Sequence, residues 1–314
     1  MTLLPKKTIL GTRGSALALW QANEVAGRLT VPWEIRVIET SGDRILDAPL
    51  QGPGRIDKGF FTKEIQDRLL EGEIDLAVHS LKDLPTEPPP GLALAAFLPR
   101  GPVNDILVVH PDWLDSSAAF PVKSGARVGA GSLRRQALLR IFAGGLEPAL
   151  IRGNVPTRIR KCDGQQYGAI VLAQAGVHRL QADVSGWRVF ALNPELWLPA
   201  PGQGAIAVEV RAGDRETCSA VAQLDHPATR RAVSIERQLL ANFQGGCSTA
   251  FGCLAEKQDD RWRVRLGVDL PDKGWQVVCF EGSEAECSAQ DACTLAARLA
   301  PQAPGEKWLC RPLA

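Results

Sequence analysis

The residues best suited to take part in a chemical reaction follow a short apolar run at residues 76–78. After that run, Lys82 and Asp83 stand side by side before Pro85. Because proline opposes continuation into a helix, a turn is expected here. In an open α/β sheet, ligands bind beyond the carboxyl ends of the strands. The pair could therefore hold an anionic substrate with the lysine and do chemistry with the carboxylate, or it could be a solvated ion pair on a turn.

Other basic residues recur at strand ends and helix starts. Free backbone N–H groups and the helix dipole favour anions at such places, and arginine adds a planar fork that matches a carboxylate. The groups are Arg13 with Ser15, Lys82, Ser132 with Arg134 and Arg135, and Arg152 with Asn154, Thr157 and Arg158. Any one of these arginines could simply be an exposed surface residue, but four such groups predict an anion-binding site. Since no phosphate-loop motif is present, several separate carboxylates suit these arginines better than one phosphate.

A third signal is a cysteine, Cys247, that follows two glycines just beyond a predicted helix. Glycines let a loop approach a ligand closely, although burial as a small apolar side chain is the commoner fate of a free cysteine. The eight cysteines contain no Cys-x-x-Cys, and the four histidines lack metal-ligand spacing to them. We therefore predict no metal site, and we find little support for protease-type nucleophilic catalysis.

Composition sets the broad class. The chain has 314 residues, 45% of them apolar and 23% charged, which predicts a globular protein of two or three domains. A formal net charge of +1 provides no overall field for nucleic acid or for a membrane surface. No secretory signal or membrane-length apolar stretch is evident, so we expect a cytoplasmic protein with mostly free, buried thiols.

The elements that must position these residues alternate between strand and helix patterns. Strands are expected at residues 8–11, 34–39, 75–78, 92–97, 105–109, 127–129, 149–151 and 169–172, and helices at 16–28, 60–70, 132–142, 155–161 and up to about 180. This alternation predicts two α/β domains with parallel sheets covered by helices. A Pro- and Gly-rich stretch at 198–204 is predicted to be a hinge or crossing segment. The strand at 205–210 could return to the first sheet.

The pattern changes after residue 225. A long helix is expected from Pro227 to about Gly245, followed by strands at 261–266 and 275–280 and a final helix at 286–299. This predicts a separate α+β unit.

Seven ordered motifs resemble those of the porphobilinogen deaminases, also called hydroxymethylbilane synthases. They are Gly-Thr-Arg-Gly-Ser-Ala-Leu-Ala-Leu-Trp-Gln (11–21), Asp-Lys-Gly-Phe-Phe-Thr-Lys-Glu (57–64), Ala-Val-His-Ser-Leu-Lys-Asp-Leu-Pro (77–85), Gly-Ser-Leu-Arg-Arg-Gln (131–136), Ile-Arg-Gly-Asn-Val-x-Thr-Arg (151–158), Leu-Pro-Ala-Pro-Gly-Gln-Gly-Ala (198–205) and Glu-Arg-x-x-x-x-x-Phe-x-Gly-Gly-Cys (236–247). The resemblance runs from Thr8 to about Gly252 and is weaker beyond. Seven motifs in order are far more specific than any one of them.

The resemblance implies a fold and a reaction. The fold is two periplasmic-binding-protein-like α/β lobes with mixed, mainly parallel sheets, plus a small α+β C-terminal domain. The implied domains are 1–104 with 200–223, 105–199, and 224–314. The reaction joins four porphobilinogen molecules head to tail, with release of four ammonia, into hydroxymethylbilane for tetrapyrrole biosynthesis. It is primed by a dipyrromethane cofactor that a thioether links to the cysteine matching Cys247.

The resemblance also implies roles for individual residues. Asp83 matches the catalytic carboxylate, which would stabilise the pyrrole cations of the reaction and could relay protons. The residues matching cofactor- and substrate-binding positions are Arg13, Ser15, Lys58, Lys82, Ser132, Arg134, Arg135, Arg152, Asn154, Arg158, Arg179 and Gln203. We expect a monomer that acts on small molecules, with no nucleic-acid or membrane partner.

Some positions depart from the family pattern. Ser41 and Asn104 stand where arginine is usual, and Ala250 stands where proline is usual. Residues 51–57 are somewhat longer than usual, which leaves open whether Arg55 or Lys58 serves in that loop.

Two other functions remain in view. A non-catalytic, two-lobed protein that binds small anions would share the lobes, but it would need neither Gly-Gly-Cys nor a third domain. A nucleic-acid-binding or regulatory protein could use the arginine groups, but the near-neutral net charge and the lack of a basic stripe count against it.

Overall fold

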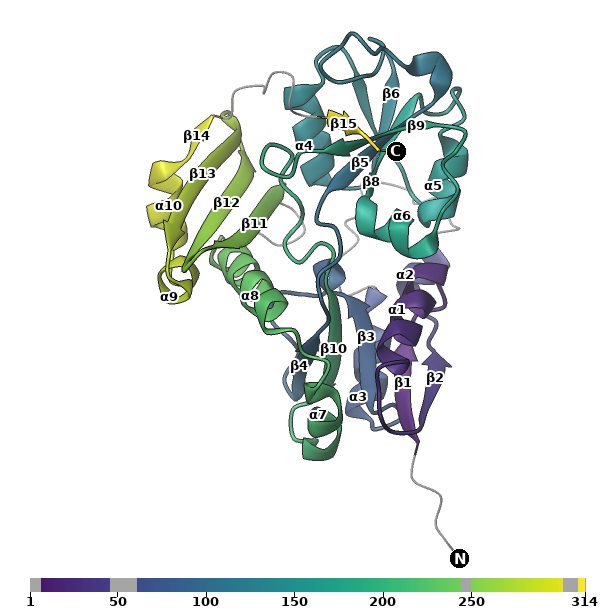
Figure 1. The fold of residues 1–314 in the computed structure, drawn as a ribbon, viewed down its shortest axis with the longest axis vertical. Helices are drawn as coiled ribbons and strands as arrows, with labels where there is room; N and C mark the ends of the chain where they lie inside the picture. Colours follow the sequence, from purple (N-terminus) through teal and green to yellow (C-terminus); the bar gives the residue numbers. More distant parts are fainter. Residues whose placement is uncertain (1–6, 46–60, 244–249, 302–309, 314) are drawn as a thin grey trace, which may run out of the picture. The chain divides into compact units, whose positions relative to one another are not determined.

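The computed structural model describes residues 7–45, 61–243, 250–301 and 310–313 (Figure 1). These residues fold into two compact units. Unit 1 comprises residues up to 101 together with 204–233, and unit 2 comprises residues 102–203 together with those from 234 onward. We describe each unit separately.

Unit 1 is built on a five-stranded sheet with the order β2-β1-β3-β10-β4. Its strands are β1 (Thr8–Thr12), β2 (Trp33–Val37), β3 (Leu76–Ser80), β4 (Leu92–Phe97) and β10 (Ile206–Arg211). β1 pairs in parallel with β2 and β3, whereas β10 pairs antiparallel with both β3 and β4. β10 therefore runs against the other four strands. The predicted return of this strand to the first sheet is confirmed.

Helices pack on both faces of this sheet. The helices of unit 1 are α1 (Ala16–Ala26), α2 (Ser41–Ile45), α3 (Lys63–Leu70) and α7 (Arg215–Ala222). α1 and α7 share one apolar core with Leu76 and Val78 of β3. α3 packs into a second core with Ala77, which points to the opposite face because side chains alternate along a strand. The predicted α/β architecture is confirmed here.

Unit 2 contains a six-stranded sheet with the order β15-β9-β5-β8-β6-β7. Its strands are β5 (Asp105–Val109), β6 (Arg127–Ala130), β7 (Glu147–Leu150), β8 (Ala169–Ala173), β9 (Arg188–Leu192) and β15 (Cys310–Pro312). β6 pairs in parallel with β7 and β8, and β5 pairs antiparallel with β8 and β9. The sheet is mixed, as predicted, but β9 and β15 were not expected from the sequence. The helices that follow its strands are α4 (Leu133–Phe142), α5 (Val155–Lys161) and α6 (Gln174–Leu180).

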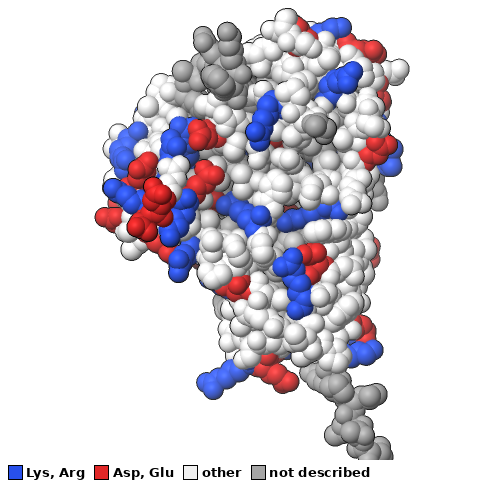
Figure 2. Space-filling model, in the orientation of Figure 1, with Lys and Arg blue, Asp and Glu red and all other residues white. Residues whose placement is uncertain are grey.

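A second sheet in unit 2 is formed by β11 (Phe251–Gln258), β12 (Arg261–Leu270), β13 (Gly274–Gly282) and β14 (Ala300–Pro301), all paired antiparallel. Figure 2 shows acidic and basic side chains intermixed over this sheet, as expected of a solvated face. On its inner side, Leu254 and Trp275 share a buried core with Leu107 and Trp197. The separate third domain therefore stays a prediction, because these strands group with residues 102–203 in one compact unit.

A long helix, α8 (Pro227–Asn242), begins in unit 1 and ends in unit 2. Its buried Glu236 accepts hydrogen bonds from the backbone N–H groups of Gly202, at 2.8 Å, and Ala255, at 3.0 Å. The predicted end of this helix at Gly245 lies outside the described residues. Among the described residues, no helix combines the length and apolar character needed to cross a membrane.

The single final helix predicted at 286–299 is wrong. The structure has two short helices instead, α9 (Glu284–Ser288) and α10 (Ala292–Arg298). Ser283 and Glu286 form a capping box that starts α9, and Asp291 starts α10 by accepting a hydrogen bond from the N–H of Thr294 at 2.7 Å. A capping residue in the middle of an apolar pattern therefore divided one predicted helix into two.

We predict that Asp291→Ala lowers the free energy of unfolding by about 1 kcal/mol, because it removes this helix cap. Asp291→Asn, which keeps a capping oxygen, should lose much less. The measurement is urea unfolding of both variants followed by circular dichroism. Equal losses in the two variants would mean that the cap does not stabilise α10.

Candidate active site

The predicted catalytic turn of unit 1 is held by its apolar neighbours. β3 is buried along residues 76–79 and leads into a 3-10 turn, η2 (Leu81–Asp83). Leu81 and Leu84 are buried, and the N–H of Leu81 donates to the carbonyl of Ala205. Since both leucines point into the core, the residues between them are turned outward. Lys82 is half-buried and Asp83 is exposed.

Arg13 and Ser15 lie just after β1. Ser15 caps α1 by accepting a hydrogen bond from the N–H of Ala18 at 3.3 Å. The Arg13 guanidinium forms an ion pair with Asp43 of α2, and its central carbon lies 4.4 Å from the centre of the Phe61 ring. The arginine predicted to bind substrate is thus held by an internal carboxylate and an aromatic face.

The electrostatics of Asp43 follow from these contacts. Burial by itself raises the pKa of this carboxyl, but hydrogen bonds from Arg13 and Thr40 outweigh that effect and bring the pKa below its ordinary value. The Thr40 hydroxyl donates to Asp43 Oδ2 at 2.7 Å. Asp43 is therefore ionised at neutral pH and balances the charge of Arg13.

These elements enclose a pocket in unit 1. Three of the predicted residues, Arg13, Ser15 and Asp83, line it together. The remaining lining residues are Leu17, Ala18, Gln21, Phe61, Thr62, Val78, His79 and Ser80. The pocket offers a guanidinium, hydroxyls, an imidazole and a carboxylate, a set that can bind an anionic group and stabilise positive charge beside it. Lys82 lies on the same turn but is not among the lining residues.

A buried polar pair behind this pocket was not found from the sequence. His79 Nε2 lies 3.1 Å from Glu209 Oε2, and these side chains are 4% and 1% exposed. Gln66 of α3 donates to both oxygens of Glu209, at 3.0 and 3.2 Å. A single acid inside the otherwise apolar stretch Ile-Ala-Val-Glu-Val of β10 was the available signal, because a buried carboxylate requires partners.

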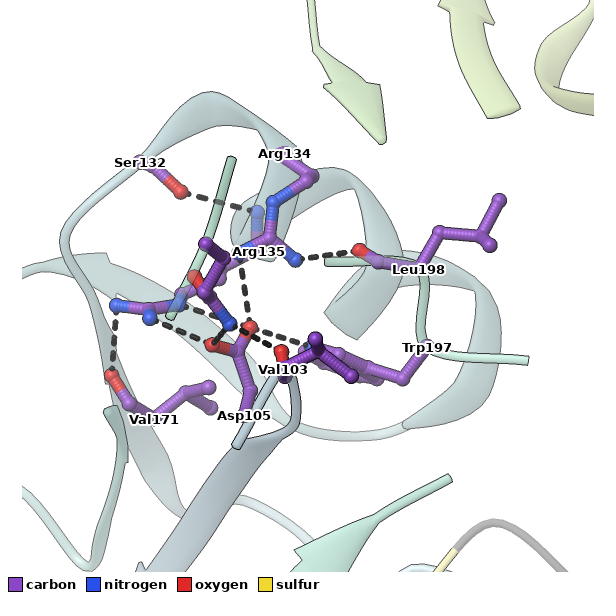
Figure 3. Close-up of polar contacts among 9 residues, drawn as sticks. Val103, Asp105, Ser132, Arg134, Arg135, Val171, Trp197 and Leu198 are labelled. Carbon is purple, nitrogen blue, oxygen red and sulfur yellow. Dashed lines mark hydrogen bonds and ion pairs between the residues drawn. The ribbon is translucent and has the colours of Figure 1, made fainter. Parts of the chain in front are cut away.

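In unit 2 the predicted binding residues gather around Asp105, the first residue of β5 (Figure 3). Arg134 donates to Asp105 Oδ2 at 2.9 Å, and Arg135 donates to Oδ1 at 2.7 Å and to Oδ2 at 3.1 Å. Ser132 caps α4 by accepting from the N–H of Arg135. Asp105 is fully buried, and Arg134 and Arg135 are 5% and 6% exposed. The two guanidiniums thus meet an internal carboxylate.

Two further side chains complete this cluster. Trp197 donates from its indole N–H to Asp105 Oδ2 at 3.0 Å (Figure 3). The Gln203 amide donates to Asp105 Oδ1 at 2.9 Å. Gln203 also donates to the carbonyl of Val103 at 2.8 Å. The cluster holds two guanidiniums and one carboxylate, so it carries one uncompensated positive charge. Burial lowers the pKa of Arg134 most strongly, and Arg135 adds to this effect against the opposing attraction of Asp105.

The third arginine group lies at the start of α5. Asn154 caps this helix by accepting from the N–H of Thr157 at 2.9 Å. Arg158 donates to the carbonyl of Gly153 at 2.6 Å, and its guanidinium lies so close to Gly131 that a Cβ there would meet it at 2.7 Å. Arg152 is half-buried, and among the described residues its guanidinium forms no ion pair or hydrogen bond.

The remaining predicted residues divide into two sets. Arg179 is half-buried in the last turn of α6. Lys58, Arg55 and Cys247 lie outside the described residues. Of the thiols that are described, none forms a disulfide, and burial raises the pKa of Cys162 and of Cys310 to about 12, which suppresses their reactivity. The described part of the chain has no group of three or more His, Cys, Asp or Glu side chains that could hold a metal ion.

Two of the departures from the family pattern have local partners. Ser41 donates from its backbone N–H to Glu64 of α3 at 2.8 Å, and its hydroxyl contacts the same oxygen. Asn104 donates to the carbonyl of Leu192 at 3.0 Å. Both residues therefore make internal contacts where an arginine would be usual.

Comparisons with known proteins agree with the motifs. A family model described as porphobilinogen deaminase, dipyromethane cofactor binding domain, matches residues 8–219. The chain belongs to the porphobilinogen deaminase family. Curated porphobilinogen deaminases from Syntrophomonas wolfei and Pelotomaculum thermopropionicum are similar to it, at 42% and 41% identity over 96% and 95% of this chain and 97% and 93% of theirs. The family predicted from seven motifs is therefore confirmed, as is dipyrromethane as the family's cofactor.

Solved structures give a weaker likeness. The Bordetella pertussis BvgS periplasmic VFT2 domain matches with a TM-score of 0.41 and 16% identity, covering 70% of this chain and 87% of that chain. A similarity of this size cannot locate functional residues.

We predict that Asp105→Asn lowers the free energy of unfolding by about 3–5 kcal/mol, because it leaves two buried guanidiniums without a carboxylate. Denaturant unfolding of wild type and variant measures the loss. Asp260→Asn, at an exposed position of the same unit, is the control and should change stability little. A small loss at Asp105 would show that the cluster is not a charged, buried network.

We also predict a pH-dependent effect of Asp43→Asn. Since the folded pKa of Asp43 lies below its unfolded value of about 3.9, its ionised form stabilises the fold above that value and the stabilisation disappears as pH falls through the folded pKa. The stability gap between wild type and variant should be widest above about pH 5 and should narrow as the pH is lowered below about 4. Urea unfolding across this range is the measurement, with Asp67→Asn as an exposed control in unit 1. A gap independent of pH would contradict the prediction.

Proposed function

We propose that this chain performs the porphobilinogen deaminase reaction with Asp83 as its catalytic carboxylate and Cys247 as the attachment point of the dipyrromethane. In each condensation the C–N bond of the aminomethyl group breaks and ammonia leaves. The exposed methylene then forms a C–C bond with the α-carbon of another pyrrole, which loses its proton. After four condensations water releases hydroxymethylbilane. The observation that carries the proposal is the pocket that joins Arg13, Ser15 and Asp83 in a member of this family.

The charges of unit 2 fit an anionic, carboxylate-bearing cofactor. Arg134 and Arg135 share one carboxylate, so one buried positive charge is left to be balanced. Arg152 adds a guanidinium that has no ion-pair partner among the described side chains. When bound, the dipyrromethane supplies a pyrrole end to which the first porphobilinogen is joined. We propose that Ser132, Arg134, Arg135, Arg152, Asn154 and Arg158 hold pyrrole carboxylates, together with Arg179, Gln203 and Lys58.

The role of Arg13 follows from its present partner. It is engaged by Asp43, so a pyrrole carboxylate that binds Arg13 must share or replace that ion pair. Arg13 would then act as an anion site that is already oriented by Asp43 and by the Phe61 ring. Ser15 and Lys82 are proposed to bind beside it.

The role of Asp83 follows from its placement. The buried Leu81 and Leu84 fix the turn, so the exposed carboxylate is held beside the pocket without a large side-chain rearrangement. A preorganised carboxylate next to the pyrrole N–H groups stabilises the positive charge that develops when ammonia leaves. The other acids considered from the sequence, Asp43 and Asp105, are both engaged by arginine.

We further propose a cytoplasmic monomer with three domains that has no nucleic-acid or membrane partner. The near-neutral net charge supports the lack of a nucleic-acid or membrane partner. A non-catalytic anion-binding protein is not favoured, because the relatives over nearly the whole length of the chain are named as enzymes.

We predict that the purified active protein carries an added mass equal to two porphobilinogen units less two ammonia. Intact-mass spectrometry measures it, and Cys247→Ser should lack the adduct because its hydroxyl cannot form the thioether. Cys279→Ser, at an exposed thiol elsewhere in the chain, is the matched control and should keep the adduct. Active protein with no adduct would refute the attachment.

We predict that Asp83→Asn lowers turnover of porphobilinogen about 100- to 1000-fold, because the shape is kept while the negative charge is lost. Asp83→Glu keeps the charge but displaces it by one methylene, so it should retain more activity. Steady-state turnover is compared after intact-mass spectrometry has shown equal cofactor loading. Turnover of the loaded Asn variant at the wild-type rate would make Asp83 a turn residue only.

A further inference from the structure

One buried pair of titratable groups has no part in the scheme above, although one of its members lines the pocket. His79 is the fourth residue of β3 and Glu209 lies on the neighbouring strand β10. Both side chains are more than nine-tenths buried, yet His79 shares the pocket wall with Asp83 and Arg13. A carboxylate removed from water beside an imidazole is costly to maintain unless the two groups interact.

The partners of Glu209 restrict its possible roles. Within the described residues its oxygens contact only the Gln66 amide and the imidazole of His79, so no arginine or lysine balances its charge. A neutral amide solvates the carboxylate without neutralising it. Glu209 is therefore placed to stabilise a positive charge that the imidazole of His79 acquires when it accepts a proton.

The orientation of the ring matters equally. Nε2 faces Glu209 at 3.1 Å, although it is not aligned for a full hydrogen bond. Nδ1 is the ring nitrogen left over, and it makes no hydrogen bond within the part of the chain that the structure describes. An imidazole that has a buried carboxylate at one nitrogen and a lone pair available at the other can act as a general base. Hydrogen bonds of this kind commonly become shorter when substrate binds.

We propose that His79, backed by Glu209, accepts the proton that the attacking pyrrole must lose, while Asp83 stabilises positive charge. This proposal rests on the proposed function. When the new C–C bond has formed, the α-C–H bond breaks, its electron pair returns to the ring, and the proton moves to Nδ1 of His79. Glu209 stabilises the resulting imidazolium, which then passes its proton to the released ammonia. The other titratable groups that line this pocket are Arg13 and Asp83, and Arg13 is already balanced by Asp43.

The test uses porphobilinogen that carries deuterium at its free α-carbon. His79→Gln keeps an amide donor near Glu209 but removes the proton acceptor, and Glu209→Gln keeps the shape but removes the charge. Turnover should fall about 100- to 10,000-fold in the first variant and less in the second. In both variants the deuterium isotope effect on turnover should exceed that of the wild type, because proton removal becomes rate-limiting.

Matched measurements separate this role from a structural one. Each variant is checked for thermal unfolding and, by intact mass, for the cofactor, and His110→Gln in unit 2 serves as a control that should behave as wild type. If neither variant shows a larger isotope effect, whether or not turnover falls, the pair is structural and the proposal is overturned. If instead the wild-type protein lacks the adduct and does not turn over porphobilinogen, the proposed function itself fails.

Discussion

The hydrogen bonds to the buried carboxylate of Asp105 are the interactions that hold the segments of unit 2 together around one point. Asp105 begins β5, and its oxygens accept hydrogen bonds from two guanidiniums of α4 and from the indole of Trp197 (Figure 3). The amide of Gln203 donates to it as well. One side chain thereby links the beginning of β5, the start of α4 and the segment that ends at residue 203. Since each partner is itself buried, removing the carboxylate would leave several donors unsatisfied at once.

The same cluster connects stability with binding. Two guanidiniums on one carboxylate are oriented before any ligand arrives, which lowers the entropic cost of binding an anion. Their remaining positive charge makes that anion favourable. In unit 1, Arg13 is prepared in a similar way by Asp43 and Phe61. In both units an internal aspartate sets the geometry of an arginine that the family motifs associate with carboxylate binding.

Much of the fold followed from local patterns. The strands around residues 8–12, 92–97 and 105–109 are short apolar runs, and the helices after Ser15 and Ser132 begin at capping side chains that are recognisable in sequence. The strands β9 and β15 were missed. β15 is an edge strand of only three residues, too short to give a pattern, and β9 lies between it and β5, with partners far away in the chain. The final helix was predicted to be too long because its apolar spacing continues across Asp291, the residue that caps α10.

The sequence by itself determined the family, its cofactor and the order of the motifs, since these depend on residue types and spacing along the chain. It also placed Asp83 after a buried strand and the arginines at strand ends and helix starts. Only the tertiary structure decided which charges meet: Arg13 with Asp43, Arg134 and Arg135 with Asp105, and His79 with Glu209. Partners such as His79 and Glu209 lie 130 residues apart, and whether they touch depends on strand order, which no local preference encodes.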